Sequence, residues 1–182
     1  MSTDLPNASR DKFLDAVKQM AAYKPLPLGQ DLIKMSWKFL DSVFDYSRLR
    51  HASNQTTFPP EDAEEIKANL PKAITALEEG FPMVEKCLRA EELYAVLTYQ
   101  SALYFLRDDF KDLMDEKSST VINAWIDEEW LSEYIESWSY PPPYPECKVP
   151  DLTGVPESHT WWTNAHRRGE DNQQMKVKVN SA

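Results

Sequence analysis

The sequence contains little glycine. Its four glycines stand singly and far apart, at positions 29, 80, 154 and 169. Phosphate-binding loops cluster glycines, because the backbone must approach the phosphate oxygens without side chains in the way. The sequence therefore gives no nucleotide-binding loop of this kind, and the long glycine-poor stretches are free to form helices.

Cysteine and histidine, the common zinc ligands, are also scarce. The two cysteines, Cys87 and Cys147, are far apart in the chain, and none of the three histidines follows a glutamate at the spacing that di-iron bundles use. A zinc site built from Cys147, His159 and His166 would lack a fourth ligand. We therefore predict no metal, no cofactor and two free thiols.

No segment is apolar enough to cross a membrane. The longest run without a charged residue, 93–106, would span about 21 Å as a helix, which is short of the roughly 30 Å hydrocarbon core. The first residues also lack the basic and apolar regions of a secretory signal peptide. These features predict a cytoplasmic protein with no membrane span.

Helical periodicity dominates residues 1–139. Apolar residues recur at intervals of three and four in segments 9–23, 31–51, 59–80, 93–116 and 118–138. Pro71 lies inside the third segment, which therefore predicts one kinked helix or two short ones, and Gly80 is expected to end it. The pattern predicts an all-α bundle of five or six helices.

Segment 93–106 is apolar on nearly every side, which is typical of a central helix. Leu103 and, from segment 31–51, Trp37 are predicted core residues. Residues 118–120 are the expected N-terminal cap of the last helix, because serine and threonine accept hydrogen bonds from the first turn.

The composition changes abruptly near Tyr140. Six of the 13 prolines lie between positions 141 and 156, and Trp161 and Trp162 follow, flanked by His159 and His166. Low-complexity linkers rarely contain tryptophan, because an indole left in water gains nothing from burial. We expect residues 140–182 to form an irregular Pro/Trp-rich C-terminal arm, packed on the 1–139 bundle domain or on a partner.

The arm contains a short binding motif. Residues 141–144, Pro-Pro-Pro-Tyr, match the PPxY ligand of WW domains, whose polyproline II conformation lowers the cost of ordering on docking. A simple spacer between the helices and the arm is the alternative. Tyr144 is a binding residue only if it is exposed.

Acidic residues concentrate in one stretch. The formal net charge is −10, and residues 108–136 contain ten acids and two lysines. Such a surface repels nucleic acid and attracts a basic protein surface, although it would also simply keep the protein in solution. The candidate partner-binding residues are Asp127, Glu128, Glu129, Glu133 and Glu136 in the last helix, with Trp161, Trp162 and Tyr144 in the arm.

Two other kinds of site were weighed. Residues 159–168 interleave aromatic and basic groups, as single-stranded nucleic-acid binders do, but the acidic chain opposes such binding, so we predict no nucleic acid. We expect instead that the two indoles pack on the helices, with Arg167 and Arg168 meeting the acidic stretch. Asp108, Asp109 and Asp112 match the DDxxD spacing that holds Mg²⁺ in isoprenoid synthases, but a second carboxylate-rich helix with a suitable pattern is missing.

The sequence thus favours a non-enzymatic function. Our first hypothesis is an acidic helical protein that acts by protein–protein binding, as inhibitors or immunity-type proteins do when they neutralise an enzyme with a basic surface. This is an analogy of type. The alternative is an accessory or structural subunit that docks on a larger assembly through its C-terminal arm. A Mg²⁺-dependent enzyme on the DDxxD segment ranks last.

Overall fold

The computed structural model describes residues 4–24, 30–55, 57–87, 93–127, 151–159 and 161. Within these ranges the protein is all-α and contains no strand, which confirms the predicted fold class. The elements are α1 (Asp4–Ala21), α2 (Gln30–Ala52), α3 (Pro60–Cys87), α4 (Leu93–Asp109), the 3-10 turn η2 (Lys111–Leu113) and α5 (Glu116–Asp127).

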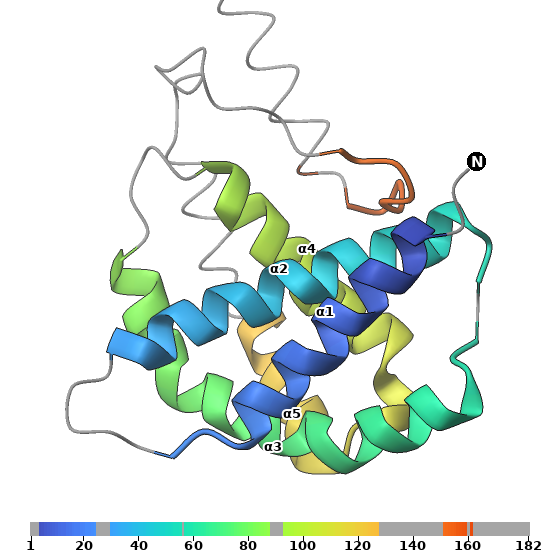
Figure 1. The fold of residues 1–182 in the computed structure, drawn as a ribbon. Helices are drawn as coiled ribbons and strands as arrows, with labels where there is room; N and C mark the ends of the chain where they lie inside the picture. Colours follow the sequence, from blue (N-terminus) through green and yellow to red (C-terminus); the bar gives the residue numbers. More distant parts are fainter. Residues whose placement is uncertain are drawn as a thin grey trace, which may run out of the picture.

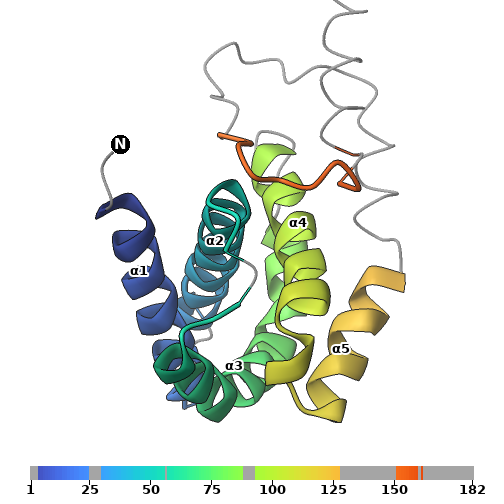
Figure 2. The same cartoon turned by 90° about the vertical axis from the view of Figure 1, so that its right-hand side faces the viewer.

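The helices form a row crossed by one further helix. Helices α1, α2, α4 and α5 lie side by side in that order, and α3 passes beneath them (Figure 2). Each neighbouring pair in the row is in contact, and α3 contacts α1, α2 and α5. The core lies where the row meets α3.

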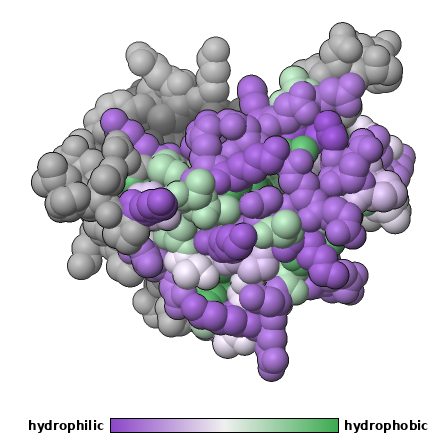
Figure 3. Space-filling view, turned by 60° about the horizontal axis from the view of Figure 1, so that its bottom comes forward, coloured by the Kyte–Doolittle hydropathy of each residue, from purple (hydrophilic) through white to green (hydrophobic). Residues whose placement is uncertain are grey.

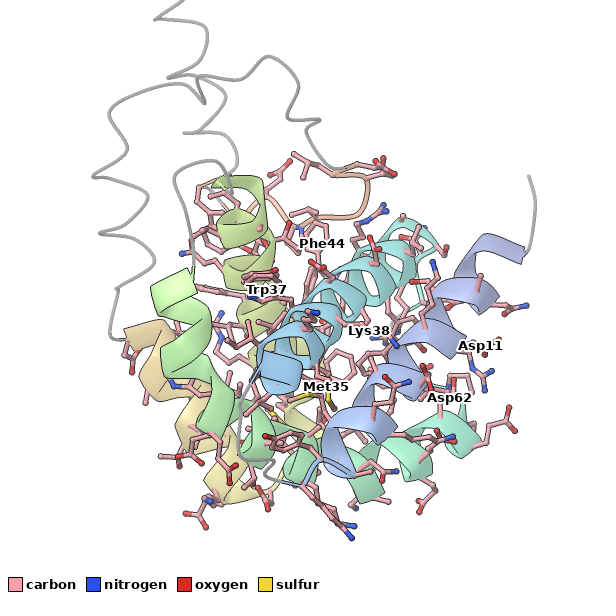
Figure 4. The ribbon with its side chains drawn as sticks, turned by 60° about the vertical axis from the view of Figure 1, so that its left-hand side comes forward. Asp11, Met35, Trp37, Lys38, Phe44 and Asp62 are labelled. Atoms are coloured by element: carbon pink, nitrogen blue, oxygen red, sulfur yellow. The ribbon has the colours of Figure 1, made fainter. Side chains whose placement is uncertain are left out.

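The core is rich in phenylalanine and leucine. Phe13, Phe39, Phe105 and Phe110 are fully buried, and Leu103 is 1% exposed, so its predicted core position is confirmed. Trp37 is only half-buried: it packs against the core from the α2 side that faces α4 (Figure 4).

Helix α3 does not end at Gly80, so the predicted stop is wrong. The helix continues to Cys87 as one element and changes direction along its length (Figure 1). Pro71 lies inside it, which fits the kinked-helix alternative, since proline cannot donate the helical hydrogen bond. A Cβ atom on Gly80 would lie 2.9 Å from Leu32 Cγ and 2.9 Å from Ser36 Oγ. This glycine therefore lets α2 and α3 approach closely.

The predicted helix 93–116 is also interrupted. Helix α4 ends at Asp109, Phe110 inserts its ring into the core, and η2 precedes a new helix. The Asp115 carboxylate accepts a hydrogen bond from the Ser118 backbone N–H, with 2.8 Å between N and Oδ1. Hydrogen bonding from the Ser118 side chain, and then from its backbone, lowers the pKa of Asp115. Asp115, rather than residues 118–120, thus caps α5.

A buried ion pair joins α1 to α3. Asp62, in the first turn of α3, is 1% exposed and accepts two hydrogen bonds from the Arg10 guanidinium, one with 2.6 Å between Nε and Oδ2 (Figure 4). The bond to Asp62 raises the pKa of Arg10, so the guanidinium stays charged. Because a carboxylate near a helix N-terminus is favoured by the helix dipole, Asp62 is well placed to hold this partner.

The central position of α4 gives a first prediction. Leu103→Ala should lower the free energy of unfolding by about 2–5 kcal/mol, because it opens a cavity in a close-packed core. Urea denaturation would measure the loss. Lys72→Ala on the exposed face of α3 is the control, expected to change stability by under about 0.5 kcal/mol. A Leu103→Ala loss as small as that of the control would contradict the central placement of α4.

Gly80 gives a second prediction. Gly80→Ala should lower the free energy of unfolding by about 1–2 kcal/mol, although alanine favours helix more than glycine does. The added methyl group meets Leu32 and Ser36, and this overlap outweighs the helix propensity. Thermal unfolding checks the sign: a more stable variant would show that α2 and α3 are not closely apposed here.

Candidate functional site

Only two of the predicted binding residues lie within the described residues. Asp127 is exposed at the end of α5, whereas Trp161 is 9% exposed and buried against the helices. Glu128, Glu129, Glu133, Glu136, Tyr144 and Trp162 lie outside the described residues, as do Arg167 and Arg168. The site that the structure does describe is the seat of Trp161.

Residues 151–159 and 161, which we call the strap, lie across the C-terminal part of α2 and against α4 (orange in Figure 1). The strap begins with a tight turn. Asp151 Oδ1 accepts a hydrogen bond from the Thr153 backbone N–H at 3.0 Å, and the Val155 N–H donates to the Leu152 carbonyl at 2.9 Å. The bond from Thr153, with the nearby charge of Arg48, lowers the pKa of Asp151.

Gly154 sets the strap directly on the backbone of α2. Its φ angle is +84°, in the region that glycine adopts without a steric cost. A Cβ atom at this position would lie 1.8 Å from the Arg48 carbonyl oxygen and 2.7 Å from the Ala52 nitrogen. Since neither backbone atom can move aside, only glycine fits between the strap and the last turns of α2.

Arg48 of α2 holds the first end of the strap. Its Nη1 lies 2.9 Å from Asp151 Oδ2, and its Nε lies 3.0 Å from Asp45 Oδ1 in the preceding turn of α2. The Arg48 side chain is 13% exposed and its guanidinium lies 5.9 Å from the centre of the Phe44 ring. Asp45 and Phe44 therefore orient the arginine toward the carboxylate of the strap.

The other end of the strap is held by one hydroxyl group of α4. Ser101 is fully buried, and its Oγ accepts a hydrogen bond from the Trp161 indole at 3.2 Å and lies 3.1 Å from His159 Nδ1. The His159 and Trp161 rings stack at 4.7 Å, Tyr104 lies 4.7 Å from Trp161, and Phe105 lies 5.0 Å from His159. A buried polar group of α4 is thus paired inside an aromatic cluster.

Burial keeps His159 neutral. The side chain is 4% exposed, and desolvation lowers its pKa to about 4. The Asp108 carboxylate acts in the opposite direction, while His51 and Arg107 lower the pKa further. An uncharged imidazole can stack on Trp161 without carrying an unpaired charge into the aromatic cluster.

Ser101 and His159 have the distance of a nucleophile–base pair, but not its accessibility. Both are buried, and the Trp161 indole occupies the same hydroxyl. A reaction at Ser101 would require the strap to leave first. While the strap lies on the helices, Ser101 and His159 attach it to α4.

The DDxxD segment is not a single helical face. Its aspartates do not lie one turn apart on one helix, because α4 ends at Asp109 and Asp112 belongs to η2. Asp108 binds Arg107, with 2.7 Å between Oδ1 and Nε, and Asp109 lies 3.0 Å from His51 Nε2. Among the described residues no group of three or more His, Cys, Asp or Glu side chains is arranged to hold a metal ion.

Arg107 connects the strap to the acidic residues. Its guanidinium lies 4.4 Å from the centre of the Tyr104 ring, which itself packs on Trp161, and it forms two hydrogen bonds with Asp108. The charge of Asp127 in α5 also helps to raise the pKa of Arg107. The aromatic cluster therefore borders the acidic part of the chain.

Sequence reasoning did not single out Arg48, Ser101 or Gly154. The pattern Asp-x-Thr-Gly at 151–154 is typical of a tight turn and would have found the start of the strap. Ser101 is a small polar residue in an otherwise apolar helical face, which indicates a buried hydrogen-bonding position. Nothing in the sequence pairs Arg48 with Asp151 or Ser101 with Trp161.

Comparison with known proteins gives no relative. No family model matches this chain, and no curated protein or solved structure matches it significantly. In the described part of the chain no helix is both long and apolar enough to cross a membrane.

The buried imidazole gives a third prediction. We expect the strap to detach as the pH falls from about 6.5 toward about 4. The folded-state pKa of His159 lies below the ordinary value, so its contribution to docking is complete above pH 6.5 and is lost as the pH falls through that window. The Trp161 indole N–H signal in NMR spectra, assigned with Trp161→Phe, would report the change.

His51 provides the control for this titration. It is exposed and paired with Asp109, so the transition should persist in His51→Gln and disappear in His159→Gln, whose side chain stays neutral. A transition that remains in His159→Gln would assign the pH dependence to another group.

Proposed function

We propose that this protein acts by binding another protein through the acidic surface, which we define as Asp112 of η2 and Glu116 and Asp127 of α5. The acids at 128–136, which lie outside the described residues, are further candidates from the sequence. The partner presents a basic surface, as expected for an enzyme neutralised by an inhibitor or immunity-type protein. Strong charge complementarity makes such associations fast and selective.

The observation that carries this proposal is the unequal pairing of the acids. Asp62, Asp108 and Asp109 have cationic partners in the chain. Asp112, Glu116 and Asp127 are exposed, and the structure gives them no ion-pair partner among the described residues. These carboxylates remain available to an external cation.

Helix α5 also places apolar side chains beside the acids. Val121, Trp125 and Ile126 are half-buried and pack against the core. The face seen from below Figure 1, where α3 and α5 lie, is largely hydrophilic with small apolar areas between the polar side chains (Figure 3). Aromatic residues bordered by charges are typical of the centres of protein interfaces, which supports α5 as the contact helix.

The position of Trp161 favours this proposal over the accessory-subunit alternative. An arm that docks on an assembly needs its anchors free, whereas Trp161 and His159 are seated on Ser101 of the same chain. A subunit interface that uses Trp161 would first have to displace these contacts. The alternative thus requires an opening step that acidic-surface binding does not.

The test begins with affinity capture from the native source, followed by stopped-flow kinetics with the captured protein. Replacing Asp112 with Asn, Glu116 with Gln and Asp127 with Asn together should slow association about tenfold at low salt, because steering by exposed charges is lost. The association rate of the triple variant should also depend less on salt. Each exposed change should alter stability by under about 0.5 kcal/mol.

A matched variant removes the same charge elsewhere. Asp11→Asn, Glu61→Gln and Glu64→Gln are exposed changes on α1 and the start of α3, and together they should leave the association rate within about twofold of the unmodified chain. If both triple variants slow association equally, net charge rather than the acidic surface steers the partner. Unchanged kinetics in both would contradict the proposal.

A further inference from the structure

We propose that the surface beneath the strap is a second docking site, which binds an extended peptide segment of another protein, and that the strap occupies it as an intramolecular competitor. This strap-binding surface consists of Phe44 and Arg48 of α2 and Ser101, Tyr104 and Phe105 of α4. The inference does not depend on the acidic surface, because it uses different residues and a different partner chemistry.

Most of the strap lies near the surface of the bundle. Among residues 151–159 only His159 is buried, and the others are half-buried or exposed. The Asp151 side chain in the ion pair with Arg48 is 62% exposed. Between its two ends the strap is held by the contact of Gly154 with α2 and by half-buried Leu152 and Val155, which pack against the core. The contacts among α1 to α5 do not involve the strap, so they remain in place when it leaves.

The surface beneath the strap has the composition of a binding site. Three aromatic rings, one arginine and one buried hydroxyl lie within the length of an eleven-residue segment. Arginine and tyrosine are enriched in interface hot spots, and the Ser101 hydroxyl can accept a hydrogen bond from a donor of the ligand, as it does from Trp161.

The strap itself defines the chemistry of the ligand. Arg48 binds the Asp151 carboxylate of the strap, so the ligand should carry an acid at this position. The α2 backbone leaves no room for a side chain at Gly154, so the ligand should carry a glycine there. Ser101 selects an aromatic N–H donor about ten residues after the acid, as in Trp161. We therefore infer a partner segment that carries an acid, a glycine and a tryptophan or histidine in this order.

Tethering sets the conditions for exchange. The strap belongs to the same chain as the strap-binding surface, so its docking is an intramolecular step with an effective concentration that a free peptide must match. A free peptide of equal intrinsic affinity would therefore compete poorly while the strap is closed. Opening the strap should raise the apparent affinity for the peptide without any change in the surface.

The experiment uses the full chain with Gly154→Ala, which removes the strap from α2 by steric overlap and leaves the surface unchanged. The probe is a fluorescein-labelled synthetic peptide of residues 149–163. We expect the peptide to bind the Gly154→Ala chain about tenfold or more tightly than the unmodified chain, as measured by fluorescence anisotropy. The same peptide with Gly154→Ala should bind neither chain.

Charge exchange tests the register of binding. In the Gly154→Ala chain, Arg48→Glu should weaken binding of the probe, and a peptide with Asp151→Lys should recover it. Glu157→Gln in the peptide is the control, since Glu157 is exposed in the strap and should have no effect. A chain with His159→Ala and Trp161→Ala serves as a second open form if Gly154→Ala lowers the yield of folded protein.

Two results would overturn the proposal. One is a failure of the probe to bind either open form while circular dichroism shows intact helices, since the surface would then hold only a tethered strap. The other is a dimer in sedimentation of the unmodified chain with the strap cross-linked to the second copy. The occupant would then be another copy of this chain rather than a different protein.

Discussion

The position of the strap depends on the close contact between Gly154 and the Arg48 carbonyl. This contact fixes the strap on the last turns of α2, so Asp151 meets Arg48 at one end and Trp161 reaches Ser101 at the other. A larger residue at position 154 would push the strap away from the α2 backbone. The ion pair between Arg48 and Asp151 and the hydrogen bond between Trp161 and Ser101 could not span the added distance. The same principle operates at Gly80, where the absence of a side chain brings α3 against α2.

The acids of this chain differ in whether they have partners within it. Near the helix junctions acids hold elements together: Asp62 binds Arg10 between α3 and α1, Asp109 lies beside His51 of α2, and Asp115 caps α5. Around η2 and α5 the exposed acids lack such partners among the described residues. Because acids with and without partners contribute equally to the net charge, the net charge alone does not locate a binding surface. The pairing of each carboxylate shows which acids a partner could reach.

The sequence was sufficient for features that depend on local pattern. Periodicity predicted the all-α class and the bounds of α2 to within a residue, and the apolar character of 93–106 predicted the buried position of Leu103. It failed where a distant contact decides. Gly80 is typical of a helix end, but here it allows a close contact with Leu32. Phe110 continues the helical spacing of the sequence, but α4 ends before it and its ring lies in the core. Ser101 binds residues that follow it by 58 and 60 positions, so its role depends on the tertiary fold.

The two proposed surfaces meet at Arg107. Its guanidinium lies on the Tyr104 ring, which supports Trp161, and its hydrogen bonds go to Asp108 beside the acidic surface. Arg107 thus belongs to both sets of contacts, and its replacement would disturb the Tyr104 wall of the Trp161 seat together with the pairing of Asp108. Variants that test one surface alone must therefore leave Arg107 unchanged.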